Sequence, residues 1–228
     1  MGEIFIPRTK IFKPYDLGGG EQRIVIDPTL TVQPAAKDAY LKQDNPTNNY
    51  GAITSLQVQD YVDTTWRTLL EFDISELPPG ATLNSASLNL NYYSYTTTDP
   101  VGKTIWAYKL TRPDWVEAQA TWNIYKTGSD WTSAGGDYVT SDPAGGSTTF
   151  PAEYDWMSWN VLPIVQDAYD GSIAAEFLVK FETEGLASGD GIAKWYSSNY
   201  PTDTSLCPKL VIDYAVAAVG RSQGHIFG

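Results

Sequence analysis

The feature that most constrains this chain is the alternation of apolar and polar residues in short segments bounded by glycine, proline and asparagine. In residues 86–93, Leu88, Leu90 and Tyr92 share one face, and polar side chains fall between them. A period of two places successive side chains on opposite faces of a strand, so one face is buried and the other meets solvent. The same alternation or strand-like composition recurs along the chain, in residues 36–41, 55–62, 66–74, 104–110, 156–161, 176–183, 193–200 and 209–214.

These segments predict an all-β chain, and a length of 228 residues is enough for one large β domain with a real core. We expect residues 38–214 to form a two-sheet antiparallel, jelly-roll-like β-sandwich. One segment departs from the pattern. Val161, Ile164, Val165 and Ala168 have helical spacing, which predicts a short helix near 162–169 crossing one end of the sandwich.

The ends of the chain have little apolar periodicity of their own. We interpret residues 1–37 as an extended N-terminal arm and residues 215–228 as a short C-terminal tail, both packing against other subunits of an assembly, with a homo-oligomer as one form. Strand addition of residues 23–27 to a neighbour's sheet edge is the geometry we expect. The predicted anchor residues are apolar side chains of these ends, namely Ile4, Phe5, Ile6, Ile11, Phe12, Ile226 and Phe227.

Charge and cysteine content exclude several functions. The formal net charge of −12 opposes binding to nucleic acid or to an anionic membrane. Cys207 is the single cysteine and His225 the single histidine, so no intrachain disulfide, cysteine–histidine catalysis or zinc site is expected. No run reaches the ~18 apolar residues of a membrane span. The first residues lack the apolar core of a signal peptide, so export by the usual route is not expected.

Two tryptophans, Trp115 and Trp122, flank Glu117 directly after the strand-like run 104–110. Two indoles bury a large apolar area while each N–H still needs an acceptor. We predict a structural corner that locks the two sheets together, with Glu117 accepting hydrogen bonds from the indoles. The alternative is an aromatic platform for a sugar or another protein.

Carboxylates are plentiful, but no spacing defines a catalytic pair of the kind glycoside hydrolysis requires. Turn capping accounts for them, so the chain is predicted not to be an enzyme and to need no cofactor. The candidate carboxylates are Asp73, Glu76, Glu117, Asp137, Glu153 and Asp155. A structural calcium site is an open alternative because oxygen ligands are available, although no loop has a spacing that demands it. Its candidate ligands are Asp38, Asp44, Asn45, Asp63, Asp73 and Asp213.

Eight tryptophans exceed what a core of this size needs, so some aromatic side chains are candidates for an exposed platform that stacks on sugar rings. Neighbouring Asn, Asp and Gln would bond the hydroxyls. For any one of these residues, burial in the core is the competing interpretation. The predicted glycan-binding candidates are Tyr50, Trp66, Tyr93, Tyr95, Trp131, Tyr138 and Trp195.

About three quarters of the chain, from Asp38 to Tyr214, resembles the DNRLRE-domain family of jelly-roll-like sandwiches, which are related to carbohydrate-binding modules. The matching pieces are collinear: 48–51 (N-N-Y-G), 67–81 (R-T-L-L-E-F-D-I-S-E-L-P-P-G-A), 85–90, 115–123 (W-V-E-A-Q-A-T-W-N), 131–137, 196–199 and 208–214. The resemblance implies a β-sandwich within secreted or cell-surface proteins, some of which bind polysaccharide.

Two functions remain open. The first is a non-enzymatic structural protein on the surface of a large assembly, with a decoration or attachment protein of a tailed-phage virion as the leading example. Its partners would be other virion subunits, anchored through the arm and the tail. The second is a secreted, extracellular carbohydrate-binding module of a polysaccharide-acting protein. The arm, the tail and the expected lack of a signal peptide favour the first, and the family resemblance favours the second.

Overall fold

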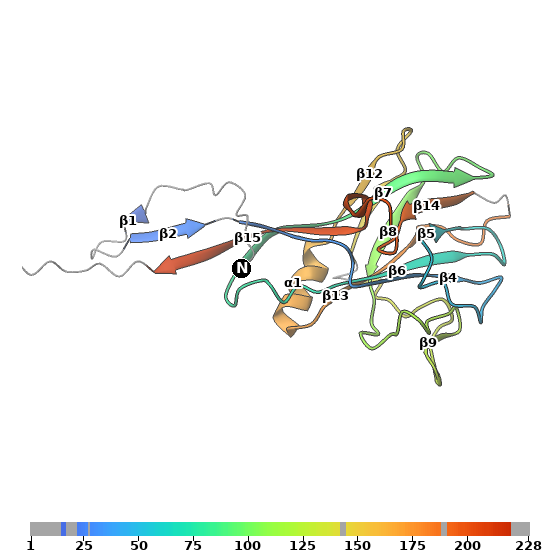
Figure 1. The fold of residues 1–228 in the computed structure, drawn as a ribbon, viewed down its shortest axis with the longest axis horizontal. Coiled ribbons are helices and arrows are strands. Elements are labelled where there is room, and N and C mark those ends of the chain that lie inside the picture. Colours follow the sequence, from blue (N-terminus) through green and yellow to red (C-terminus); the bar gives the residue numbers. More distant parts are fainter. Residues whose placement is uncertain (1–14, 17–21, 27, 142–144, 188–190, 220–228) are drawn as a thin grey trace, which may run out of the picture.

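In the computed structural model, residues 15–16, 22–26, 28–141, 145–187 and 191–219 are described (Figure 1). Strands make up 45% of the described residues and helix 7%, which confirms the all-β prediction. The predicted helix is also confirmed. It is α1 (Leu162–Gly171), and its buried residues Ile164, Val165 and Ala168 belong to the predicted set. Within the described ranges, no helix has the length and apolar character needed to cross a membrane.

Two antiparallel sheets form the sandwich. The eight-stranded sheet contains β1 (Tyr15–Asp16), β2 (Gln22–Ile26), β3 (Thr29–Val32), β5 (Ser55–Val58), β7 (Thr82–Thr96), β12 (Trp156–Asn160), β14 (Ile192–Tyr196) and β15 (Lys209–Val219). The five-stranded sheet has the order β11 (Gly145–Thr149), β8 (Thr104–Lys109), β13 (Ala175–Phe181), β6 (Trp66–Phe72) and β4 (Lys37–Lys42). A small pair, β9 (Ile124–Lys126) and β10 (Ser129–Asp130), and a 3-10 turn, η1 (Thr204–Leu206), lie outside both sheets.

The long strand β7 organises the eight-stranded sheet. Its first half pairs with β15, its middle with β12 and its last residues with β14. This is possible because the alternation predicted for 86–93 runs almost without interruption along the strand. Leu88, Leu90 and Tyr92 are buried as expected, at 0%, 0% and 2% exposure.

The main core fills the space between the two sheets. Strand β7 contributes Leu88 and Leu90, and the five-stranded sheet contributes Phe72 and Phe177 from the opposite side. Trp159 joins them, and its indole Nε1 donates to the carbonyl oxygen of Ile105 (3.1 Å), so the ring is both apolar filler and a bridge between the sheets.

A second hydrophobic cluster lies on the outer face of the five-stranded sheet. The connection between β8 and β11 folds back over this face, so that Trp115, Trp122 and Trp131 pack on Leu69 and Leu178. Trp115 is 1% exposed and Trp122 is 8% exposed, as the corner prediction requires. The expectation that the corner locks the two sheets together is wrong, because the cluster covers the outside of one sheet.

This covering has a consequence for the middle strands of the five-stranded sheet. The alternation predicted that β6 and β13 bury one face, yet all seven residues of β13 are buried. Phe177 faces the main core and Leu178 faces the second cluster. A strand covered on both faces can carry apolar residues on either side, which is why Leu69 and Leu70 are adjacent, although the ionisable residues Glu176 and Lys180 lie on the same covered face as Leu178.

The edge strand β11 overlaps residues 142–147 (D-P-A-G-G-S), whose composition is typical of a loop. Residues 145–149 instead pair with β8, and Gly145 lies opposite Tyr108. Gly145 has φ +121°, and a Cβ there would lie 1.8 Å from the Ala107 carbonyl oxygen. Glycine therefore permits this pairing, and the composition that suggested a loop reflects close backbone approach.

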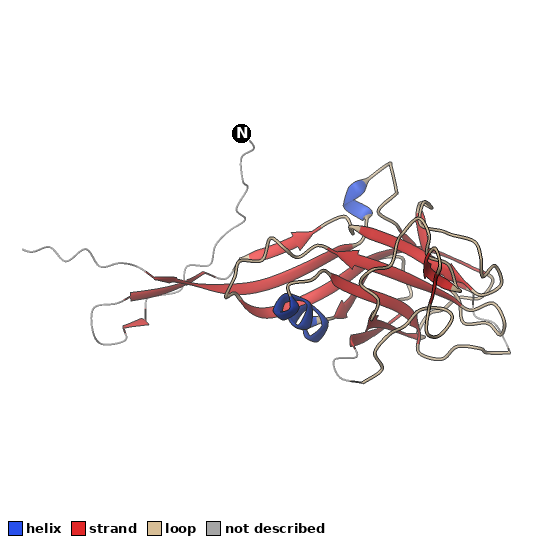
Figure 2. Cartoon of the chain, turned by 90° about the horizontal axis from the view of Figure 1, so that it is seen from below, coloured by secondary structure: helices blue, strands red, loops and turns tan. Residues whose placement is uncertain are grey.

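The arm and the tail meet one another in the described residues. Strand β3, placed within the arm from sequence, pairs with β15 in the sandwich, and the tail continues β15 to Val219. Beyond the sandwich, β2 pairs with residues 216–219 of β15, and β1 pairs with β2 (Figures 1 and 2). The expected addition of residues 23–27 to a neighbour's sheet is therefore wrong here, because this chain supplies the partner strand. All seven predicted anchor residues lie outside the described residues.

Candidate functional site

The outer face of the eight-stranded sheet carries polar and aromatic side chains where the inner face carries the core. Along β7, Asn89 and Asn91 alternate with the buried Leu88 and Leu90. The neighbouring strands follow the same alternation, so their outward residues line up with those of β7. These residues, which define the outer face, are Gln57, Asn89, Asn91, Tyr93, Trp156, Ser158, Lys194, Tyr196 and Lys209, with Tyr200 beside them.

Three tyrosines stand together at one end of this face. The rings of Tyr93 and Tyr196 are stacked, with centroids 4.3 Å apart and planes at 23°.

 Tyr200 lies against Tyr196 at 4.3 Å. The cause is a β-bulge, since Lys194 pairs with Ser94 and Trp195 with Tyr92, which leaves Tyr93 as the extra residue. A bulge re-aims the side chain at its extra position, here toward the outer face.

The phenol groups of Tyr93 and Tyr196 remain protonated at neutral pH. Burial raises the pKa of Tyr93, and a hydrogen bond to the Ser55 side chain opposes that shift. Burial also raises the pKa of Tyr196, with the neighbouring Tyr200 adding to the effect. A neutral phenol can both donate and accept a hydrogen bond, which is what a sugar hydroxyl requires.

Trp156 lies further along the face, on β12 opposite Asn91. The ammonium group of Lys209 sits 3.8 Å from the centroid of the Trp156 ring. Asn89 pairs in register with both Ser158 and Lys209, and its amide donates to the Ser87 carbonyl oxygen (2.9 Å). The outer face therefore carries the Trp156 indole, the amides of Asn89 and Asn91 and the Lys209 ammonium group side by side.

Lys194 and Lys209 differ from the other lysines and arginines whose surroundings are described. Seven of those cations form ion pairs with carboxylates, among them Arg67 with Glu184 at 2.8 Å. Within the described ranges, neither Lys194 nor Lys209 has such a carboxylate partner. In a chain of net charge −12, both of these lysines lie on the outer face of the eight-stranded sheet.

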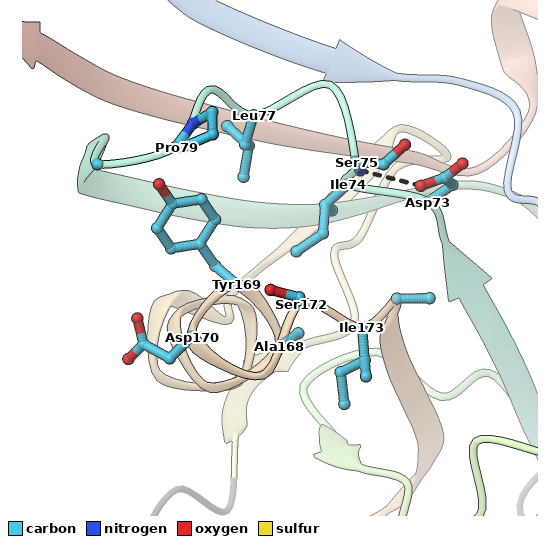
Figure 3. Close-up of a pocket in the computed structure, with 12 residues that line it drawn as sticks. Asp73, Ile74, Ser75, Leu77, Pro79, Ala168, Tyr169, Asp170, Ser172 and Ile173 are labelled. Atoms are coloured by element: carbon cyan, nitrogen blue, oxygen red, sulfur yellow. Dashed lines mark hydrogen bonds between the residues drawn. The ribbon is translucent and has the colours of Figure 1, made fainter.

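A hollow of considerable size lies elsewhere. A cavity of about 600 Å³ opens between the β6–β7 connection and the end of α1 (Figure 3). Its one aromatic ring, Tyr169, is engaged, because its hydroxyl donates to the Pro78 carbonyl oxygen (2.7 Å) and accepts from the Ala81 N–H (2.9 Å). Asp73 is likewise engaged with the Ser75 N–H (2.9 Å). This hollow offers no free aromatic ring for a sugar.

The predicted glycan-binding residues are spread over the molecule. Tyr93 lies on the outer face of the eight-stranded sheet. Trp66, Trp131 and Trp195 are 7%, 4% and 0% exposed, so the expectation that they are exposed is wrong. Trp195 fills the main core, Trp131 the second cluster, and Trp66 donates its indole N–H to Asp44 (2.7 Å).

The remaining three candidates are partly exposed but lie apart from that face. Tyr50 stacks on Tyr40, with centroids 4.5 Å apart. Tyr95 packs against the main core. Tyr138 lies beside Tyr108 at 4.9 Å, over the five-stranded sheet. Sequence alone could not separate these environments, because an aromatic residue suits a core and a platform equally well.

Glu117 has a structural position, but its partner differs from the one predicted. Its Oε1 accepts the backbone N–H of Asp38 (2.9 Å), whereas the indole of Trp131 donates to the Thr121 carbonyl oxygen (2.8 Å). Trp115 Nε1 has no hydrogen-bond partner among the described residues. The expectation that Glu117 accepts from the indoles is therefore wrong for the bonds described.

The other candidate carboxylates mostly serve turns and strand ends. Asp137 accepts from the N–H groups of Thr132 and Ser133, and Asp155 accepts from the Trp156 N–H. Asp213 accepts from the hydroxyls of Thr29 and Ser85, two strands of one sheet. In the described part of the chain, no three acidic, His or Cys side chains gather as metal ligands would.

Asp38, considered as a calcium ligand, is 1% exposed and accepts the Ser198 N–H at 2.6 Å. Burial raises its pKa to about 7, and Glu117 adds to the shift. The carboxyl thus ties β4 to the connection that follows β14. Its single described acceptor role explains its position without a metal.

Sequence reasoning missed Trp156, Tyr196, Lys194 and Lys209. A signal was present, because each is out of phase with buried residues of its own strand: Trp156 with Met157, and Lys194 and Tyr196 with Trp195. What the sequence does not carry is the order of the strands. The residues are brought together only by the pairing of β12, β14 and β15 with β7.

Comparison with known proteins agrees with this geometry. The model of carbohydrate-binding module family 96 matches residues 29–213, which is most of the chain and includes every residue of the outer face. The match begins at β3, the first strand that pairs within the sandwich. No curated protein matches the chain. With a sandwich fold and a match of this extent, the chain belongs to carbohydrate-binding module family 96.

Proposed function

We propose that this chain binds polysaccharide on the outer face of the eight-stranded sheet. One observation carries the proposal: Trp156 and the Tyr93–Tyr196–Tyr200 cluster share this face with amides and with two lysines that have no carboxylate partner. Aromatic rings contact the apolar faces of sugars, and amides, phenols and ammonium groups bond their oxygens.

The two lysines indicate what kind of polymer suits the face. An ammonium group without a carboxylate partner is available to a charged ligand, and carboxylate or sulfate groups are the charged groups of polysaccharides. The pair lies on a molecule whose other charges are mostly negative, so it would concentrate attraction at this face. We therefore expect tighter binding to an anionic polysaccharide than to a neutral one.

The test is affinity electrophoresis of the chain in gels that contain soluble neutral or uronic-acid polysaccharides. The parent should be retarded, most strongly by a uronic-acid polymer at low salt. Trp156→Ala should weaken binding about tenfold, the size expected of a central aromatic contact. Lys194→Ala with Lys209→Ala should reduce binding to the charged polymer alone. Tyr61→Ala, at an aromatic residue that is 37% exposed outside this face, is the control. Equal retardation of parent and Trp156→Ala would remove the proposal.

The proposed binding role needs no catalytic group. Several of the described carboxylates are engaged in turns and ion pairs, and the family is one of binding modules. An extracellular setting fits a polysaccharide partner. The family match supports this role over the virion-surface role, which rests on the terminal strands alone.

Those strands support a second candidate role in assembly. The ribbon of β2 and the end of β15 projects past the sandwich (Figure 2), and residues 24–26 and 215–219 are all apolar. A two-stranded ribbon is marginal by itself in water. We take a second copy of the chain as its partner. Sedimentation of parent and of Val25→Lys with Val216→Lys should show an oligomer for the parent only, and a monomeric parent would exclude this role.

A further inference from the structure

A second group of aromatic rings lies on the opposite side of the sandwich. Trp106 and Tyr108 alternate along β8 with Ile105 and Ala107, which are buried in the main core. Their rings are nearly parallel, with planes at 13° and centroids 5.5 Å apart. Neither ring belongs to the two hydrophobic clusters. Both therefore stand on the outer face of the five-stranded sheet, beside the part covered by the β8–β11 connection.

Hydrogen bonds and cations hold these rings in place. Trp106 Nε1 donates to Oε1 of Glu182 (3.1 Å), the residue that directly follows β13. The Lys180 ammonium lies 5.8 Å from the Tyr108 ring centroid, and the lysine is only 5% exposed. Glu184 pairs with Lys180 at 3.2 Å and also with Arg67 at 2.8 Å, so this cation already has a carboxylate partner. A platform whose orientation is fixed before binding loses less entropy when a ligand arrives.

The strand beside these partly exposed rings adds little cover to them, and Tyr138 packs on Tyr108 with ring centroids 4.9 Å apart. On β11, Gly145 lies opposite Tyr108 and Ser147 lies opposite Trp106. Gly145 admits no side chain, because a Cβ there would lie 1.8 Å from a carbonyl oxygen of β8. Strand β11 is also the edge of its sheet, so no further strand follows it among the described residues.

We propose that Trp106 and Tyr108 form a second polysaccharide site, selective for sugar units without charged groups. This inference rests on the proposed function of the other face. The two sites differ in charge. The outer face of the eight-stranded sheet has two lysines without a carboxylate partner among the described residues, whereas Lys180 beside Tyr108 has one in Glu184, and Glu182 beside Trp106 is acidic. An acidic group repels anionic sugars and accepts hydrogen bonds from hydroxyls. Because the sites lie on opposite sides of the sandwich, one molecule can hold two polymer chains.

The experiment compares Trp106→Ala, Trp106→Phe and Trp156→Ala by isothermal titration with a soluble neutral polysaccharide, xyloglucan, and an anionic one, polygalacturonate. We expect Trp106→Ala to lose about tenfold in affinity for the neutral polymer and to bind the anionic polymer like the parent. Trp156→Ala should do the reverse. Trp106→Phe, which keeps a ring but not the N–H, should retain part of the neutral binding, and it serves as the folded variant if the alanine is unstable.

A second measurement is light scattering of a mixture of both polymers. The parent should raise it by cross-linking, and each alanine variant should not. If Trp156→Ala abolishes binding to both polymers, or Trp106→Ala changes neither, the second site is refuted while the first stands. If the parent binds no polysaccharide of the wider panel, the proposed function and this inference both fail.

Discussion

Glu176 and Glu71 lie directly opposite each other on the neighbouring strands β13 and β6, on the face that the second cluster covers. The Lys37 ammonium binds the Glu71 carboxylate at 2.5 Å. Oε1 of Glu176 has no hydrogen-bond partner among the described residues. Burial raises the pKa of Glu176 to about 9, and Glu71 adds to the shift by a hydrogen bond and by its charge. Glu176 therefore keeps its proton at neutral pH.

This pair predicts a pH-dependent stability. The folded pKa of Glu176 lies above its unfolded value, so the folded state binds the proton more tightly. The contribution is fully present below the unfolded pKa of about 4.5 and is lost as pH rises toward 9. Glu176→Gln should therefore unfold at higher denaturant than the parent at pH 8.5, by on the order of 1–3 kcal/mol, and nearly equally at pH 4.5.

Chemical denaturation of both proteins across this pH range checks the prediction. Asp38 has a raised pKa of about 7 and acts in the same direction, but it is common to parent and variant and cancels in their difference. Glu76→Gln, at an exposed glutamate, is the matched control and should leave the pH dependence unchanged. If the free energies of unfolding of Glu176→Gln and the parent differ by the same amount at all pH values, Glu176 does not have a raised pKa in the folded protein.

The second cluster predicts a large cost for truncating Trp115. This residue is 1% exposed and is among the largest fully buried side chains. Trp115→Ala should lower the free energy of unfolding by roughly 3–5 kcal/mol, because apolar contact is lost and a cavity remains. Thermal unfolding measures the loss. Tyr154→Ala, at an aromatic residue that is 57% exposed, should change it far less. Equal effects would mean that the connection over the five-stranded sheet is not a core.

Arg67 predicts that a change of cation alone is destabilising. Its guanidinium binds both oxygens of Glu184 (2.9 and 2.8 Å), donates to the Gly135 carbonyl oxygen (2.9 Å) and lies 5.1 Å from the Trp122 ring centroid. Lysine keeps the charge but cannot make this planar set of bonds. Arg67→Lys should cost about 1–3 kcal/mol in unfolding experiments.

The comparison for Arg67 is Lys126→Ala. Its ion pair with Asp114 is exposed, so its loss should hardly change the free energy of unfolding. If Arg67→Lys is as mild as Lys126→Ala, the position requires a positive charge only, and the bidentate bond with Glu184 adds nothing measurable.

Gly51 predicts a specific steric limit between two connections. A Cβ at this position would lie 2.4 Å from the Glu117 carbonyl oxygen and 2.8 Å from its Cγ. Asn49 fastens the same place, because its amide donates to the carbonyl oxygens of Glu117 (2.6 Å) and Ala120 (2.8 Å). Gly51→Ala should destabilise the fold by about 1–3 kcal/mol, through backbone displacement.

Gly171→Ala is the matched control, since its Cβ would meet only Ile173 at an ordinary distance of 3.5 Å. Differential scanning calorimetry of the two variants separates them. A Gly51→Ala protein that melts with the parent would show that the β4–β5 connection can move away from Glu117.

How far the sequence predicts this molecule depends on whether a property is local. The strands β5, β7, β12 and β14 were predictable because alternating apolar and polar residues are typical of a strand that buries one face. The helix was predictable from four apolar positions between Val161 and Ala168. The burial of Trp195 and the partial exposure of Trp156 were not predictable. Both are tryptophans on strands, and only the pairing with neighbouring strands shows which face of the sheet each one is on.

Pairing between distant segments was also beyond local reasoning. Strand β15 meets β2 and β3, whose residues precede it by most of the chain, and the sequence around 23–27 specifies an apolar strand without naming its partner. The same limit applies to the candidate site. Lys194 and Lys209 look like ordinary strand lysines until the order of the strands places them on one face, where neither forms an ion pair with a carboxylate among the described residues.

Strand β13 is central in its sheet and covered on both sides, by the main core and by the connection that carries Trp115. Its amide hydrogens are bonded to β6 and β8 and have no path to solvent short of separating three layers. Exchange of these hydrogens for deuterium should therefore proceed only when the whole domain unfolds. The slowest-exchanging amides of β13 would then report the global stability of the molecule directly, without any denaturant.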